Sequence, residues 1–335
     1  MTTEHIRLQP NRQDMDNAYR VVNAISQVFS SKVVGQENLR ESLLIGLLTG
    51  GHILLESVPG LAKTTAARVV ADSISGGFQR IQCTPDLLPS DIIGTQIYDS
   101  STNSFTTQLG PVHTNIVLLD EINRSSAKTQ SAMLEAMEER QTTIAGQLYP
   151  IPDPFVVIAT QNPVDQEGTY PLSEAQTDRF MLKEVLRYPM PQEEAEVIFR
   201  IDAGVYDRDR KPRPVVGLDD IRRLQQVVRN VHMDQVLVHY ASQLVHATRN
   251  SEQFLPPHLA KLVEYGASPR ATIAFCRASR ALAVLNGRNH VIPDDIHKLA
   301  YRVLRHRLIL GFEAVRAKVT PETVIDAVLA SVRVP

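Results

Sequence analysis

The segment 52–64 joins a short apolar run to a loop that ends in Lys63-Thr64, and this feature constrains the fold more than any other in the chain. The run Ile53-Leu54-Leu55 predicts a buried strand, and residues 66–70 predict a helix directly after the loop. A loop that leads from a strand into a helix N-terminus offers backbone N–H groups and a favourable dipole to an anion. The segment is therefore typical of an α/β fold that binds the phosphates of a nucleotide.

The loop departs from the strict phosphate-binding pattern G-x-x-x-x-G-K-[ST], because Ser57 and Ala62 stand at the two glycine positions. A non-glycine residue forced to positive φ costs roughly 1–2 kcal/mol, so Ser57 either keeps a negative φ or strains the loop. The alternative is an ordinary strand-to-helix turn with a solvated lysine. In a true phosphate loop, Lys63 would reach the β- and γ-phosphates, and the Thr64 hydroxyl would hold Mg²⁺. The residues expected to surround the phosphates are Val58, Pro59, Gly60, Leu61, Ala62, Lys63, Thr64 and Thr65.

A second apolar run, Ile116-Val117-Leu118-Leu119, is followed directly by Asp120 and Glu121. Uniformly apolar runs of this length are typical of parallel strands that are covered on both faces. At the end of such a strand, Asp120 suits an acid that binds Mg²⁺ through water. Glu121 suits the general base that activates the attacking water. The alternative is a helix N-terminus with the usual preference for acidic residues.

A third apolar run covers residues 155–160 and predicts another buried strand. Asn162 follows it, and we expect this amide to lie beside the other two strand ends, where it could hold a water against the γ-phosphate. Taken alone, Asn162 before Pro163 is more typical of a turn.

The chain resembles the MoxR-type AAA+ ATPases over nearly its whole length. In this family alanine is usual before the phosphate-binding lysine, whereas Ser57 still replaces the usual glycine. A set of segments in one order is far more specific than a single motif. The segments that carry the resemblance are 34–37, 56–64, 84–91, 120–124, 128–131, 159–163, 166–171, 178–180 and 266–270.

The resemblance implies a role for further residues. It implies that Val34 and Gly35 line the adenine, that Arg179 is a finger for the neighbouring subunit's nucleotide, and that Arg270 contacts the γ-phosphate of its own subunit. Guanidinium groups suit phosphoryl transfer because charge spreads over the transferred oxygens, and a finger is worth roughly 10³–10⁵ in rate. Two roles remain open for Arg124: a second inter-subunit contact, or an ordinary arginine at the start of a helix. The expected catalytic set is Glu121, Asn162, Arg179 and Arg270.

Composition excludes several classes of protein. The net charge of −2 lacks the basic excess of most nucleic-acid binders. Cys83 and Cys276 have no metal-binding spacing and suit a reducing compartment, so we expect a cytoplasmic location. No apolar run approaches about 18 residues, and the start lacks a signal sequence, so we expect no membrane segment.

With 335 residues the chain suffices for about two domains. We expect a loose segment at 1–15, an AAA+ α/β nucleotide-binding domain at 16–188, and an all-helical lid domain at 189–335. The first domain should have a central parallel sheet, closed by a strand at 181–187, and β-hairpin inserts near 94–107 and 142–149. Helices are expected at 16–30, 36–49, 64–75, 127–140, 193–202, 218–231, 234–250, 271–287, 293–310 and 323–331.

The resemblance implies an ATP-hydrolysing ring, a hexamer by family expectation, that acts as a chaperone-like remodeller. Relatives mature, activate or load metal into partner complexes, often beside a protein with a von Willebrand factor A domain. One alternative is a nucleotide-gated binding switch with little turnover, which Ser57 keeps open. A nucleic-acid motor is a weaker alternative, because hairpin inserts also occur in helicases while the charge balance opposes it.

Overall fold

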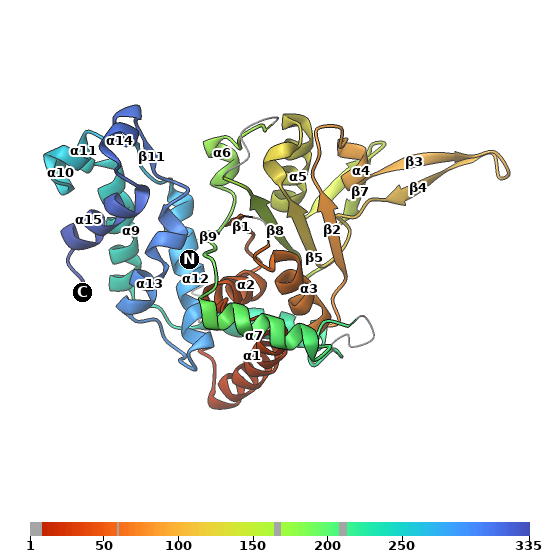
Figure 1. Cartoon of the computed structure of the whole chain (residues 1–335), viewed down its shortest axis with the longest axis horizontal. Coiled ribbons are helices and arrows are strands. Elements are labelled where there is room, and N and C mark those ends of the chain that lie inside the picture. Colours follow the sequence, from red (N-terminus) through yellow and green to blue (C-terminus); the bar gives the residue numbers. More distant parts are fainter. Residues whose placement is uncertain (1–8, 59, 164–168, 208–212) are drawn as a thin grey trace, which may run out of the picture. The chain divides into compact units, whose positions relative to one another are not determined.

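The computed structural model describes residues 9–58, 60–163, 169–207 and 213–335, and it divides into two compact units (Figure 1). The α/β unit consists of residues 23–180 and 184–222. The helical unit consists of residues 181–183 and 223–335, together with residues 9–22. Each unit is described by itself.

A five-stranded sheet with the order β2-β5-β8-β1-β9 forms the centre of the α/β unit. Strands β2 (Phe78–Gln82), β5 (Ile116–Asp120), β8 (Val156–Gln161) and β1 (Ile53–Glu56) pair in parallel, and β9 (Leu182–Val185) lies at the edge. Strand β5 is buried throughout, and β8 and β1 are buried up to their last residue, as expected for strands covered on both faces. The predicted central parallel sheet is confirmed.

Helices cover both faces of this sheet, with α5 (Ala127–Glu139) on one side and α2 (Glu37–Thr49) and α3 (Lys63–Ser73) on the other (Figure 1). Met133, Leu134 and Met137 of α5 share a hydrophobic core with inward-facing residues of β1, β5 and β8. Ser126 caps the N-terminus of α5 by accepting a hydrogen bond from the Thr129 N–H at 3.3 Å. The remaining elements are α1 (Arg12–Lys32), α4 (Pro89–Ile93), η1 (Ile122–Arg124), α6 (Glu174–Thr177) and α7 (Pro191–Asp202).

Both predicted hairpins are present in the α/β unit. Strands β3 (Gly94–Asp99) and β4 (Ser104–Leu109) form an antiparallel ribbon that extends away from the sheet (Figure 1), and β6 (Gln141–Ile144) pairs with β7 (Gln147–Pro150). Gly94 has a φ of 111°, and a Cβ there would lie 2.3 Å from the Gln108 carbonyl oxygen. Only glycine therefore fits the base of the first hairpin.

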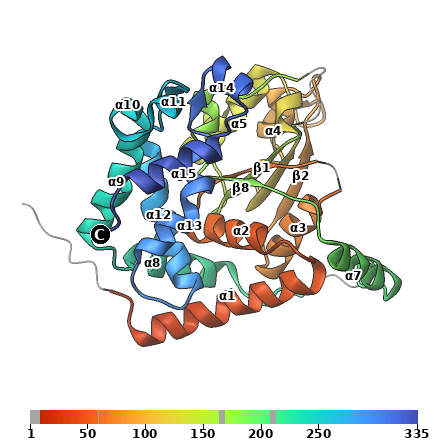
Figure 2. The ribbon, with the colours of Figure 1, turned by 60° about the vertical axis from the view of Figure 1, so that its left-hand side comes forward.

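The helical unit is built around α9 (Gln235–Arg249), α12 (Pro269–Leu285), α13 (Pro293–Leu304) and α15 (Pro321–Ser331), which lie side by side (Figure 2). Its interior holds fully buried side chains such as Tyr240 and Phe275. Among the described residues, no helix has the length and apolar character needed to cross a membrane. The other helices are α8 (Leu218–Asn230), which begins in the α/β unit, α10 (Ser251–Phe254), α11 (Pro257–Ala260) and α14 (Phe312–Ala317).

The helix predicted at 293–310 is wrong in its last third. It ends at Leu304, and β11 (Ile309–Leu310) instead pairs antiparallel with β10 (Val263–Tyr265). Short apolar runs fit a helix face and a strand equally well, so apolar spacing alone could not separate the two. The helical lid therefore also contains a small two-stranded ribbon.

Residues 184–222 group with the α/β unit, although the sequence predicts a domain boundary at residue 188. Two hydrogen bonds hold them there. The Arg200 guanidinium donates to the Ser30 carbonyl oxygen at 2.7 Å, and the Val215 N–H donates to the Ser73 carbonyl oxygen at 2.9 Å. The compact units thus differ from the predicted division into 1–15, 16–188 and 189–335. Where a separately folding lid begins stays a prediction.

Candidate functional site

The carboxyl ends of β1, β8 and β5 meet at one edge of the α/β unit's sheet. Strand β8 lies between the other two, with Ile158 opposite both Ile53 and Leu118. The loop after β1, Asn162 after β8 and the acids after β5 are therefore neighbours, as expected for the ends of parallel strands. Asn162 itself is buried.

Ser57 does not have a positive φ, so this departure from the glycine pattern does not strain the loop. The Ser57 N–H donates to the Gln161 carbonyl oxygen at 3.1 Å, and the Ser57 hydroxyl donates to the Val58 carbonyl oxygen at 2.7 Å. The residue in the left-handed region is Ala62, with φ 55° and ψ 21°. Gly60, with φ 88°, lies in open space, and Pro59 lies outside the described residues.

Helix α3 begins at Lys63, directly after Ala62, and its first helical hydrogen bond runs from the Ala66 N–H to the Ala62 carbonyl oxygen. The N–H groups of the first turn, at Lys63, Thr64 and Thr65, therefore have no acceptor within the helix. Ala62 provides no side-chain cap. The start of α3 presents backbone donors and the positive end of its dipole, which is the chemistry that phosphate oxygens require.

Asp120 is buried at the end of β5, and neighbouring strands hold both of its oxygens. Oδ1 accepts a hydrogen bond of 2.8 Å from the Thr160 hydroxyl of β8. Oδ2 accepts from the Arg80 guanidinium of β2, with its Nη2 at 2.6 Å and Nε at 3.1 Å. Asp120 and the Thr64 hydroxyl are oxygen donors, and Mg²⁺ suits one or two such groups together with phosphate and water, so the residues fit the expected ion.

Glu121 has a left-handed backbone, with φ 58° and ψ 53°. Its N–H donates to the Thr160 hydroxyl oxygen at 2.8 Å, so the same threonine holds both acids. The carboxylate accepts from the Arg124 guanidinium, with Nη1 at 3.0 Å from Oε2. Arg124 thus pairs within its own chain with the expected general base, a contact that the sequence does not predict.

The segment expected to line the adenine contacts α7. Gly35 has a φ of 68°, and a Cβ at this position would lie 2.4 Å from Cδ of Glu193. Glu193 is fixed there because its carboxylate accepts a hydrogen bond of 2.7 Å from the Met190 N–H. Gly35 therefore lies against Glu193 in the first turn of α7.

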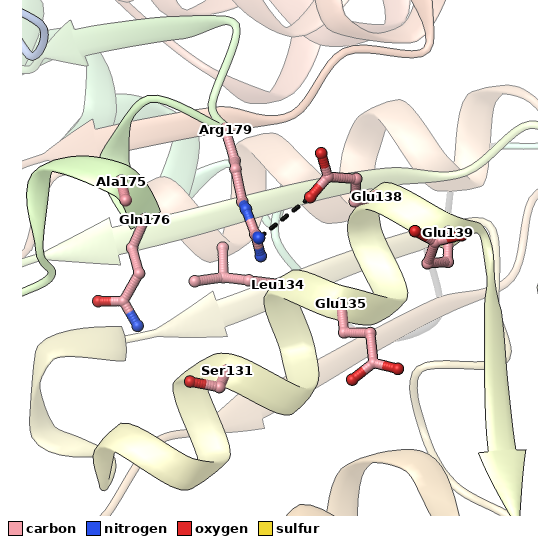
Figure 3. Close-up of a pocket in the computed structure, with 8 residues that line it drawn as sticks. All are labelled: Ser131, Leu134, Glu135, Glu138, Glu139, Ala175, Gln176 and Arg179. Atoms are coloured by element: carbon pink, nitrogen blue, oxygen red, sulfur yellow. Dashed lines mark ion pairs between the residues drawn. The ribbon is translucent and has the colours of Figure 1, made fainter.

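Arg179 projects from the turn after α6 across a pocket of about 340 Å³ towards α5 (Figure 3). Its Nη2 lies 3.1 Å from Oε2 of Glu138. This expected finger thus forms an ion pair with an acid of its own chain. The pocket is lined by Ser131, Leu134, Glu135, Glu138, Glu139, Ala175, Gln176 and Arg179.

Arg270 lies in the first turn of α12 in the helical unit. The helix begins at Pro269, two residues before the predicted start, and Ser268 caps it by accepting from the Arg270 N–H at 3.1 Å. The role of Arg270 towards the γ-phosphate stays a prediction.

Sequence reasoning missed four residues at the site: Arg80, Thr160, Glu138 and Glu193. Thr160 left a signal, because it is a hydroxyl residue at the end of an otherwise apolar run. Arg80, Glu138 and Glu193 meet Asp120, Arg179 and Gly35, and each of these partners lies 40 or more residues away in sequence. No local pattern could have identified them.

Comparison with known proteins identifies the family of this chain. Residues 52–182 match the model of the ATPase family associated with various cellular activities (AAA), and residues 258–328 match the AAA lid domain. Chaperone MoxR1 of Mycobacterium tuberculosis is 48% identical over 90% of this chain and 79% of its own, and Bacillus subtilis YeaC is 44% identical over 90% and 91%. A crystal structure of a candidate ATPase from Cytophaga hutchinsonii superposes with a TM-score of 0.89 at 41% identity, covering 96% of this chain and 97% of the other. The chain therefore belongs to the MoxR family of AAA+ ATPases.

Proposed function

We propose that this protein hydrolyses ATP with Mg²⁺ and that efficient hydrolysis requires a ring of identical subunits, in which a hexamer is the expected form. The observation that carries the proposal is the pair Asp120 and Glu121, both fixed by Thr160 at the strand end beside the phosphate loop. Family membership supports the same activity.

In this proposal each residue has a defined task. Lys63 and the first turn of α3 neutralise the phosphates, while Thr64 and Asp120 hold Mg²⁺, which stabilises charge on the phosphate oxygens when bound. Glu121 takes the proton from the attacking water, and Asn162 orients that water. Arg179 reaches the nucleotide of the neighbouring subunit.

The nucleotide-gated switch is less well supported. It rested on a strained loop at Ser57, but Ser57 keeps a negative φ and extends the backbone pairing of β1 to Gln161. The loop therefore needs no glycine at this position.

We infer that the energy of hydrolysis serves to remodel partner proteins. One relative is named a chaperone, which supports this class of activity. The two hairpins offer exposed apolar side chains, among them Tyr98, Phe105 and Leu148, and the Thr107 and Tyr149 hydroxyl groups link the hairpins at 2.9 Å. They are the surfaces that we propose contact a client. Maturation or metal loading of a complex, beside a von Willebrand factor A domain protein, is the finer form of this proposal.

The first test is steady-state ATP hydrolysis against protein concentration, with the mass of the same samples measured in parallel. Specific activity should rise as a hexamer-sized species appears. Glu121→Gln should bind ATP but hydrolyse it at least about 100-fold more slowly. Flat activity near zero despite clear ATP binding would contradict the proposal and favour the switch.

A mixing experiment tests the finger. Arg179→Ala and Lys63→Ala should each be slow alone, because one lacks the finger and the other lacks phosphate binding. Mixed rings contain interfaces with both groups intact, so mixing should restore part of the activity. Absence of rescue at every ratio would show that Arg179 does not act on a neighbour's nucleotide.

A further inference from the structure

Two ion pairs of the α/β unit each engage a group that the proposed reaction needs elsewhere. Arg124 pairs with Glu121, the expected base, and Arg179 pairs with Glu138, although Arg179 is the expected finger. The side chains of Arg124 and Arg179 are 45% and 33% exposed, and those of Glu121 and Glu138 are 21% and 41% exposed. Pairs that are this open to water are weak, so a competing partner can replace them.

The pocket between α5 and α6 has the charge and the space for a second guanidinium. Glu135, Glu138 and Glu139 line it together with a single arginine, Arg179 (Figure 3). If Arg179 leaves for a phosphate, three glutamates line a pocket of about 340 Å³ that has lost its arginine. A cation from outside the subunit would then lower their repulsion.

The reach of the finger identifies the cation that arrives. In the proposed reaction Arg179 touches the neighbour's γ-phosphate, and Glu138 is one contact away from Arg179. On the other side of the interface, the neighbour's Arg124 is one contact away from the base that acts on the same phosphate. If the finger reaches that phosphate, Glu138 and the neighbour's Arg124 would each lie one side-chain contact from a group that acts on it.

We propose that Glu138 of one subunit pairs with Arg124 of the adjacent subunit across the ring interface, in exchange for the two pairs within each chain. This inference rests on the proposed function. The exchange keeps the charges balanced: Arg179 leaves Glu138 for the phosphate, and Glu121 leaves Arg124 for the attacking water. Assembly thus releases the finger of one subunit and the base of the next in a single step.

Charge reversal in mixed rings tests the pair. In Arg124→Glu rings every interface sets Glu138 against a glutamate, and in Glu138→Arg rings every interface sets Arg124 against an arginine. Where the two variants alternate, both kinds of interface regain opposite charges. Mass by sedimentation, with Mg²⁺ and a slowly hydrolysed ATP analogue, reports assembly without requiring turnover.

We expect each variant alone to need at least about tenfold more protein than the wild type to assemble, and the equimolar mixture to return to within about threefold. A mixture no better than its components, while the wild type assembles, would overturn the proposal. Glu174→Arg is the matched control, because Glu174 is an exposed acid of α6 outside the pocket. If it rescues Arg124→Glu equally well, general charge attraction explains the result and the specific pair is wrong.

Two different experimental outcomes distinguish a failure of this inference from a failure of the proposed function. If the wild type neither assembles nor hydrolyses ATP, the proposed ring itself fails. If the wild type does both and the charge-reversed mixture is not rescued, only the Glu138–Arg124 pair fails. Far-ultraviolet circular dichroism of each variant verifies that a loss of assembly does not reflect a loss of folding.

Discussion

Thr160 donates a hydrogen bond of 2.8 Å from its buried hydroxyl to Asp120, the first of the two acids at the end of β5. The same oxygen accepts a hydrogen bond from the N–H of Glu121, whose backbone is left-handed. One hydroxyl on β8 therefore sets the direction of both acids.

Thr160→Val keeps the shape of the side chain but removes both hydrogen bonds. We expect kcat to fall about 10–100-fold, because partners of this kind orient the acids that act on the nucleotide. Thr160→Ser restores the hydroxyl and should stay within about threefold of the wild type. The measurement is steady-state hydrolysis with ADP affinity as a control. Equal loss in the serine and valine variants would mean that packing, not the hydroxyl, matters.

Ser57→Gly should leave the affinity for ATP within about threefold, since Ser57 does not occupy the left-handed region that favours glycine. Ala62→Gly is the informative counterpart, because Ala62 does occupy that region. We expect it to raise stability by up to about 1 kcal/mol, the strain relieved less the entropy lost. Urea unfolding and ATP titration test both variants. A large gain in affinity for Ser57→Gly would contradict the loop geometry.

Comparing Gly35→Ala with Gly146→Ala separates the cost of a positive φ from the cost of a steric clash. Both glycines have positive φ, but a Cβ at Gly35 would meet Glu193 at 2.4 Å, whereas one at Gly146 meets nothing within 4 Å. Gly146→Ala should cost about 1–2 kcal/mol of unfolding free energy from strain alone. Gly35→Ala should cost more and should also weaken ATP binding by moving α7. Equal costs would show that Glu193 moves aside freely.

His52 gives the α/β unit a defined pH dependence. Burial, and secondarily the nearby charge of Arg140, lower the pKa of His52 to about 3. The unfolded chain binds a proton near pH 6.5 and the native state does not, so stability is complete above that value and falls as the pH drops towards 3. The slope is about 1.4 kcal/mol per pH unit in this range.

His52→Gln removes this titration, so the difference in unfolding free energy between wild type and variant should shrink as the pH falls from 7.0 to 5.0. Urea denaturation at both pH values measures it. A difference that stays constant would mean that His52 becomes protonated within the native fold.

The sequence was most informative where burial is uniform. The runs that became β1, β5 and β8 are apolar on both faces, and the loop and acids directly follow them, so the strands and the edge where they end could be predicted. Hairpins and helix caps such as Ser268 also left local signals. The helix over 293–304 was predicted but its end was not, because Ile309 and Leu310 suit helix and strand equally.

The partners that hold the functional groups could not be predicted in the same way. Arg80 meets Asp120 across 40 residues of sequence, and Glu138 meets Arg179 across a comparable interval. Such pairs depend on which strands and helices become neighbours. The sequence around a charged residue on an exposed face does not indicate which residue it will pair with. The αL position of Glu121 was likewise hidden, since most glutamates avoid it.

The position of β8 between β1 and β5 has a consequence for how the protein is made. During synthesis the phosphate loop, which follows β1, emerges first, and the acids at the end of β5 emerge second. Strands β1 and β5 do not pair directly with each other. They come into register only through β8, which ends at Gln161 and carries Thr160. A ribosome must therefore release more than 160 residues before the nascent chain can close its nucleotide site, and ATP can stabilise only chains that have passed this point.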